Sequence, residues 1–94
     1  MGILPPNHAA RNLAKLLSHD NPTSEKLNTA AGRVNVAVWA FAPRRTTVRE
    51  RYIPLLKQAM EKVSGKISNA MSYRINNLQR YCEVLSPIKY RPQP

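Results

Sequence analysis

The second half of the chain carries the most regular pattern of apolar and polar positions. From residue 56 onward, apolar residues recur at intervals of three and four, which is the spacing of one face of an α-helix. This face, which we call the seam, consists of Leu56, Met60, Val63, Ile67, Met71, Ile75, Leu78, Cys82 and Leu85. The pattern predicts a helix over residues 48–85 whose seam packs on another apolar surface.

Two residues interrupt this predicted helix. Pro54 has no backbone N–H, and in a regular helix its ring clashes with the carbonyl oxygen of Glu50, so we expect a kink near Pro54. Gly65 is less favourable than Ala inside a helix by about 1 kcal/mol and marks a second point for a bend. Thr47 and Glu50 have the spacing of a capping box, which places the helix start at about Val48.

A second helical pattern precedes Pro43. Its apolar positions, again three and four apart, are Leu27, Ala31, Val34, Val38 and Phe41. They predict a helix over residues 22–42. Residues 34–40 also alternate with the period of two that is typical of a strand, so the sequence leaves helix and strand open for residues 34–42.

The first predicted helix covers residues 8–18. Its apolar face consists of Ala10, Leu13, Ala14 and Leu17. Arg11 and Lys15 lie on the other face, and no acidic residue precedes Asp20. A basic, acid-free amphipathic segment is typical of mitochondrial targeting, but an ordinary first helix that packs on the rest has the same pattern. The sequence does not decide between the two.

Together these patterns predict an all-α chain of two or three amphipathic helices. Residues 1–94 form a single small subunit, and the proline-rich segments 1–7 and 86–94 are expected to be extended arms. A chain of this length buries a smaller fraction of its surface than a larger domain does. We therefore expect the helices to share their apolar faces with partners rather than to form a self-sufficient compact core.

Charge is the largest departure from an ordinary domain. The chain has 15 Lys and Arg against 5 Asp and Glu, a net charge of +10, which predicts an acidic partner. Other protein subunits with acidic surfaces, anionic lipid head groups and RNA all meet that description. The basic residues that we consider as partner-binding or phosphate-binding candidates are Arg44, Arg45, Arg49, Arg51, Lys62, Lys66, Arg80, Lys89 and Arg91.

Side chains for catalysis or metal binding are few. Asp20 is the only aspartate, and the two histidines, His8 and His19, stand beside no plausible nucleophile and orienting acid, so we expect no catalytic residues and no enzyme. One cysteine and two distant histidines do not supply a structural zinc site, and we expect no metal and no cofactor. No stretch has the roughly 20 apolar residues of a membrane-spanning helix.

These observations favour a non-catalytic accessory subunit of a large assembly. Its basic arms and helix faces would dock on partners, and the first helix favours a mitochondrial location, in a respiratory or ATP synthase complex. The alternative is an RNA-binding protein such as a ribosomal or mitoribosomal subunit. With a single cysteine, an intramolecular disulfide is impossible, and a reducing compartment is expected.

Overall fold

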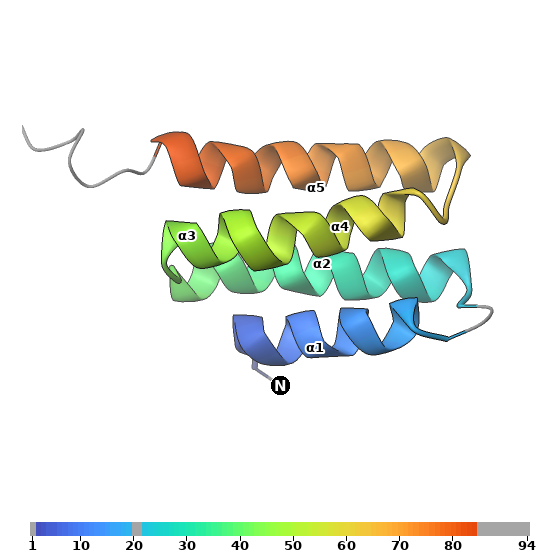
Figure 1. Ribbon diagram of the computed structural model, residues 1–94, viewed down its shortest axis with the longest axis horizontal. Coiled ribbons are helices and arrows are strands. Elements are labelled where there is room, and N and C mark those ends of the chain that lie inside the picture. Colours follow the sequence, from blue (N-terminus) through green and yellow to red (C-terminus); the bar gives the residue numbers. More distant parts are fainter. Residues whose placement is uncertain (1, 20–21, 85–94) are drawn as a thin grey trace, which may run out of the picture.

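The computed structural model describes residues 2–19 and 22–84. Every regular element in that part of the chain is helical, which confirms the all-α fold class. The elements are α1 (Pro6–Leu17), α2 (Ser24–Phe41), α3 (Arg45–Thr47), the π-helical turn η1 (Val48–Tyr52), α4 (Ile53–Met60) and α5 (Gly65–Val84). Because α3, η1 and α4 follow one another without a break, the described residues form four rods (Figure 1).

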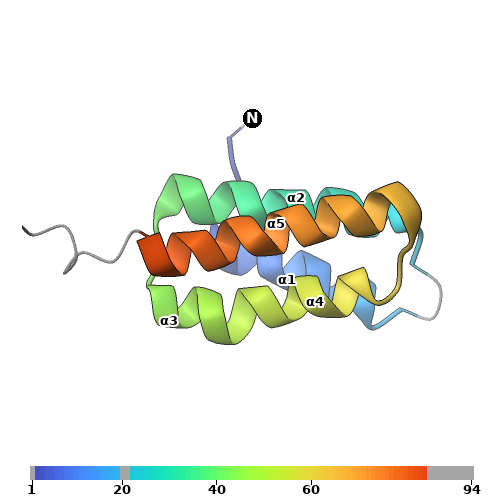
Figure 2. The same ribbon diagram turned by 90° about the horizontal axis from the view of Figure 1, so that it is seen from above.

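The four rods form an up-and-down bundle. α1 packs on α2 and α4, and α5 packs on the same two helices from the other side. The turn between α4 and α5 lies at one end of the bundle, and the turn between α2 and α3 lies at the other, beside the end of α5 (Figures 1 and 2). We call residues 60–66 the lysine end, and residues 39–49 with 80–84 the arginine end.

One apolar core runs along the bundle, and no charged side chain of the described residues is buried in it. Of the seam, the structure buries Leu56, Met71, Ile75, Leu78 and Cys82 and packs Met60, Val63 and Ile67 against the core edge; Leu85 lies outside the described residues. The expectation that the chain has no self-sufficient compact core is wrong. The apolar faces of the helices pack on one another, because the two halves of the seam lie on two antiparallel helices that share one core.

This reversal also corrects the predicted single helix over residues 48–85, which is two antiparallel segments. Lys62 N donates to Ala59 O at 3.0 Å, ending α4, and α5 begins at Gly65. Gly65 has φ +62°, a left-handed conformation that glycine adopts without steric cost. The spacing of three and four continues through the turn because α4 and α5 face the same core.

The segment before α4 also differs from the prediction. The helix begins at Arg45 rather than at Val48, and Thr47 is itself helical, with φ −64° and ψ −43°, so the predicted capping box is not formed. Ile53 N donates to Val48 O across the five-residue step of a π turn. This wider turn directly precedes Pro54, which would disturb a regular α turn, and it is the distortion that the structure shows near that residue.

α1 and α2 lie close to their predicted ranges. Residues 34–41 are helical, so the strand alternative is excluded, and Thr23 caps α2 by accepting from Lys26 N at 3.2 Å. Phe41 was expected on the buried face but is 50% exposed, because it lies in the last turn of α2. α1 already begins at Pro6, and the segment 86–94 lies outside the described residues.

α1 is part of the bundle, with Ala9, Ala10 and Leu13 in the core and Ala14 exposed. No helix among the described residues is long and apolar enough to cross a membrane, in agreement with the expectation from the sequence.

Candidate binding surface at the arginine end

The loop between α2 and α3 has a tightly defined backbone. Ala42 ends α2 in the left-handed conformation, with φ 50° and ψ 58°, and its N–H donates to Val38 O at 2.9 Å. Pro43 follows, and Arg44 stands in an extended conformation directly before α3. The chain therefore reverses direction within three residues, which places the arginines at one end of the bundle.

Side chains of α5 hold this loop in place. The Tyr81 hydroxyl donates to Pro43 O at 2.6 Å, and Cys82 Sγ lies 3.6 Å from Arg45 O as a weak donor. The ring of Trp39 meets the ring of Tyr81 edge to face, with centroids 5.3 Å apart and planes at 80°. Three contacts thus tie the end of α2, the loop and α3 to α5.

These contacts bring three of the predicted candidates into one groove. Arg44, Arg45 and Arg49 line an open groove of about 640 Å³ together with Thr46 and Tyr81. Arg44 and Arg49 are exposed and Arg45 is half-buried. Because guanidinium groups bind carboxylates and phosphates through paired N–H donors, this groove suits an anionic partner.

Exposed aromatic side chains stand at the same end of the bundle. Trp39 is 44% exposed and Phe41 is 50% exposed, both in the last turn of α2. The sequence pattern did not single out Trp39. Its role becomes visible only when α2 and α5 are placed side by side, since its partner Tyr81 is 42 positions away.

The remaining predicted candidates do not join this groove. Arg51 lines a separate groove with Arg11, between α1 and α4. Lys62 lies in the turn after α4 and Lys66 in the first turn of α5, both exposed at the lysine end. Arg80 is exposed on α5, one residue before Tyr81. Lys89 and Arg91 lie outside the described residues.

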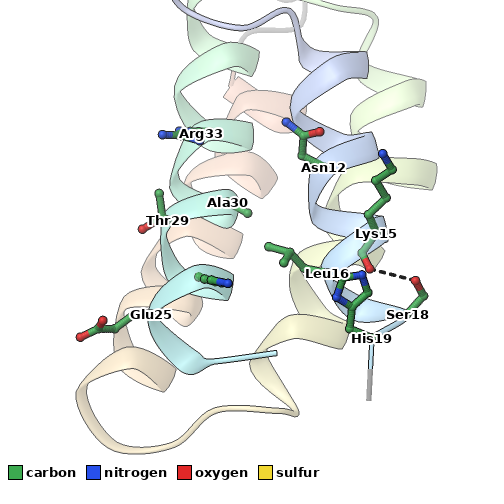
Figure 3. A pocket seen from close by; sticks show the side chains of 10 residues that line it. Asn12, Lys15, Leu16, Ser18, His19, Glu25, Thr29, Ala30 and Arg33 are labelled. Carbon is green, nitrogen blue, oxygen red and sulfur yellow. Dashed lines mark hydrogen bonds between the residues drawn. The ribbon is translucent and has the colours of Figure 1, made fainter. Parts of the chain in front are cut away.

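A further basic groove, which the sequence did not indicate, runs between α1 and α2. Lys15, Lys26 and Arg33 line it with the carboxylate of Glu25, and Figure 3 shows Lys15 and Arg33 on facing helices. Ser18 closes its end by donating to Lys15 O at 2.8 Å. The acidic side chain among the cations makes this groove less suited to an anion than the one at the arginine end.

Burial sets the protonation of two groups beside the arginine groove. Burial raises the pKa of the Cys82 thiol, although the positive charges of Arg49 and Arg45 oppose the shift. Burial also raises the pKa of the Tyr81 hydroxyl. Both groups are therefore protonated at neutral pH, and Cys82 is not an activated thiolate. Among the described residues, no three His, Cys, Asp or Glu side chains gather as metal ligands would.

Comparison with known proteins does not add an identity to this geometry. No protein-family model, no curated protein and no solved structure matches the chain.

Proposed function

We propose that the protein is a non-catalytic accessory subunit that docks on an acidic surface of a larger assembly through its arginine end. The observation that supports this is the groove that Arg44, Arg45 and Arg49 line together with Thr46 and Tyr81. It concentrates positive charge at one end of the bundle, in a chain whose net charge is +10. Such a concentration of charge steers and orients an acidic partner.

The composition of the arginine end favours a protein as that partner. Arg, Trp and Tyr are the residues that most often carry the binding energy of protein interfaces. Here the exposed Trp39 packs on Tyr81, which in turn fixes the loop that carries the arginines. A rigid anchor of this kind loses little conformational entropy when a partner binds.

RNA is the second candidate, for one specific reason. The exposed rings of Trp39 and Phe41 stand at the same end of the bundle as the arginine groove. Proteins that bind single-stranded nucleic acid combine cations along the backbone with aromatic rings for base stacking. A ribosomal or mitoribosomal subunit would use the arginine end in this way.

A mitochondrial location, in a respiratory or ATP synthase complex, is the most specific form of the proposal. It is supported by the basic face of α1, which carries Arg11 and Lys15 and no acidic residue. Because α1 contributes Leu13 to the core, the bundle would need to keep α1 after import. Intact-mass analysis of the protein from purified mitochondria should find α1 present; absence from mitochondria would remove this form of the proposal.

The docking proposal is tested by affinity purification of tagged variants from cells that express the protein. Arg44→Gln with Arg49→Gln removes two positive charges from the arginine end, and Lys62→Gln with Lys66→Gln removes two from the lysine end. We expect partner recovery to fall at least about tenfold in the first variant, as for the loss of an interface hot spot. The lysine variant should keep its partners.

Two readouts make the outcome decisive. Circular dichroism should show equal helix content in both variants, because all four residues are exposed. Parallel samples with ribonuclease separate the candidates, since protein partners survive digestion and partners held by RNA do not. Equal partner recovery by the two variants would contradict docking through the arginine end.

A further inference from the structure

A fourth groove lies away from the arginine end, between α2, α5 and the extended residues before α1. It has a volume of about 690 Å³, in the range of sites for small ligands or a few residues of a peptide. It is lined by Gly32, by Arg74 and Arg33, and by the apolar residues Ile3, Leu4 and Val36. Positive charge and apolar side chains thus share one concave surface.

Arg74 is held in this groove by only one of its guanidinium nitrogens. Nη1 donates to Asn28 O at 3.2 Å and also to Asn28 Oδ1. Among the described residues, neither Nε nor Nη2 has a hydrogen-bond acceptor, and no carboxylate pairs with Arg74. Partial burial lowers the pKa of Arg74. It also strengthens the attraction between Arg74 and any anion that pairs with it, because the charges are less screened by water.

Gly32 explains how the guanidinium lies so close to α2. A Cβ atom at residue 32 would stand 3.3 Å from Nη2, 3.5 Å from Cζ and 3.6 Å from Nε of Arg74. These nearly equal distances mean that the face of the guanidinium plane packs on the glycine. The Asn28 bonds and this contact fix the plane, so its Nε–Nη2 edge is a preorganised pair of donors.

The apolar wall begins about one helical turn from this edge. Val36 follows Gly32 by four residues, which places the two positions roughly 6 Å apart on the same face of α2. Val36 is 48% exposed and Ile3 is 50% exposed, which is high for side chains of this type in a bundle with a closed core. A carboxylate paired with Arg74 beside Gly32 would therefore lie about one helical turn from the exposed side chain of Val36.

Residues 2–4 add an unpaired backbone to the groove. They form no regular structure, and their N–H and C=O groups make no backbone hydrogen bond within the described part of the chain. An extended peptide laid beside them would find donors and acceptors, as in strand addition. A fatty acid or a free phosphate has no backbone to use these groups.

We propose that this groove binds the carboxyl terminus of a partner polypeptide that ends in an aliphatic residue. The Nε–Nη2 edge of Arg74 donates two hydrogen bonds to the terminal carboxylate, and Ile3 and Val36 contact the last side chain. Arg74 is the half-buried guanidinium of the groove, and Arg33, which also lines it, is exposed. A carboxylate that carries an aliphatic side chain suits Arg74 beside an apolar wall better than a phosphate, which has no apolar body. This inference does not rest on the arginine end.

The first experiment is an NMR titration of the full chain with the acetylated tripeptide Ala-Ala-Leu bearing a free carboxylate. We expect saturable shifts of the Gly32 amide and the Arg74 Nε–H resonances. The same tripeptide as a C-terminal amide should bind at least about tenfold more weakly, because it lacks the charge that Arg74 pairs. Equal binding of the acid and the amide would overturn the proposal.

Two further ligands separate the sources of the anion. Octanoate offers a carboxylate and an aliphatic chain without a peptide backbone, and inorganic phosphate offers an anion alone. If either binds at Arg74 as tightly as the peptide, the groove does not recognise a polypeptide terminus and the proposal fails. Weak or absent binding of both, beside binding of the peptide acid, supports it.

Variants complete the test. Arg74→Lys keeps the charge but not the paired donors, and should weaken peptide binding about tenfold, whereas Arg80→Lys on the exposed face of α5 should leave it unchanged. If Arg74→Lys unfolds the bundle, Val36→Ser decides, because this side chain is half exposed and its loss removes only wall contacts. Undiminished peptide binding by Val36→Ser would overturn the proposal.

Discussion

The arginine end and the lysine end of the bundle look alike in the sequence and differ in the structure. Both are joints between helices that carry clustered cations. At the arginine end, Tyr81 and Cys82 of α5 contact the carbonyl oxygens of Pro43 and Arg45. At the lysine end, the hydrogen bonds that the described residues form are backbone bonds within the turn, such as Lys62 N to Ala59 O. A cluster of charges becomes a defined surface where side chains from another helix fix its backbone.

The largest expected effect comes from removing the anchor of the arginine end. Tyr81 is 5% exposed, so Tyr81→Ala should lower the free energy of unfolding by about 3–5 kcal/mol, the range for a buried aromatic side chain. Val63→Ala, in the turn at the lysine end, should cost less than about 1.5 kcal/mol because Val63 is only partly buried. Urea unfolding followed by circular dichroism measures both.

Tyr81→Phe divides the first effect into its parts. It keeps the ring contact with Trp39 and removes only the hydrogen bond to Pro43 O, which should cost about 1 kcal/mol. Equal costs for Tyr81→Ala and Val63→Ala would show that the two ends are held equally, and would remove the contrast.

The next effect is a change in stability that has opposite signs at the two ends of the bundle. Gly65 has φ +62° with open space where a Cβ would stand, so Gly65→Ala should cost about 1–2 kcal/mol through backbone strain alone. Ala42 already has φ 50°, so Ala42→Gly relieves the same strain at the arginine end. It should be neutral or stabilising by up to about 1 kcal/mol, because the greater freedom of glycine in the unfolded chain offsets much of the strain that is relieved.

Thermal unfolding of these two variants gives a direct comparison. Destabilisation by Ala42→Gly of the size found for Gly65→Ala would contradict this prediction. It would mean that the left-handed backbone of Ala42 does not lower the stability of the folded protein.

The smallest effect is a dependence on alkaline pH that arises at the arginine end. Burial raises the pKa of the Cys82 thiol and that of the Tyr81 hydroxyl above their ordinary values in the folded state. The unfolded chain therefore releases these protons first, so their contribution to stability is complete below the pKa values of the unfolded chain and is lost as pH rises through those of the folded state. Replacing Cys82 by Ala should flatten the fall of the urea midpoint between about pH 8 and pH 10. An unchanged slope would contradict this assignment.

Much of the fold could be predicted from the spacing of apolar residues. The ranges 8–18 and 22–42 lie within a few residues of α1 and α2. The reversal at Gly65 could not be predicted, because a seam that serves α4 and α5 from the same core keeps its spacing of three and four across the turn. Local propensity marked Gly65 as a weak point, and only the tertiary packing decides between a bend and a break.

The candidate surface, like the fold, could be predicted from the sequence only in part. The arginine cluster was visible in the sequence because its members are neighbours along the chain. Tyr81 could not be assigned to it, since its contact with Pro43 spans 38 positions and depends on α5 running beside the end of α2. Arg74 gave no signal either, because its partners Asn28 and Gly32 lie on another helix.

The π turn at Val48–Tyr52 has a consequence for how this chain tolerates changes of length. A π turn holds one residue more than an α turn, so it has the form of a single-residue insertion absorbed in place. Deleting one residue there would restore a uniform helix and leave the segments on both sides in nearly the same orientation, whereas a deletion in a regular α turn would rotate one side by about 100° relative to the other. The arginine loop and Leu56 would both keep their places on the bundle. The π turn is thus a position where the chain can change its length by one residue without moving either its surface or its core.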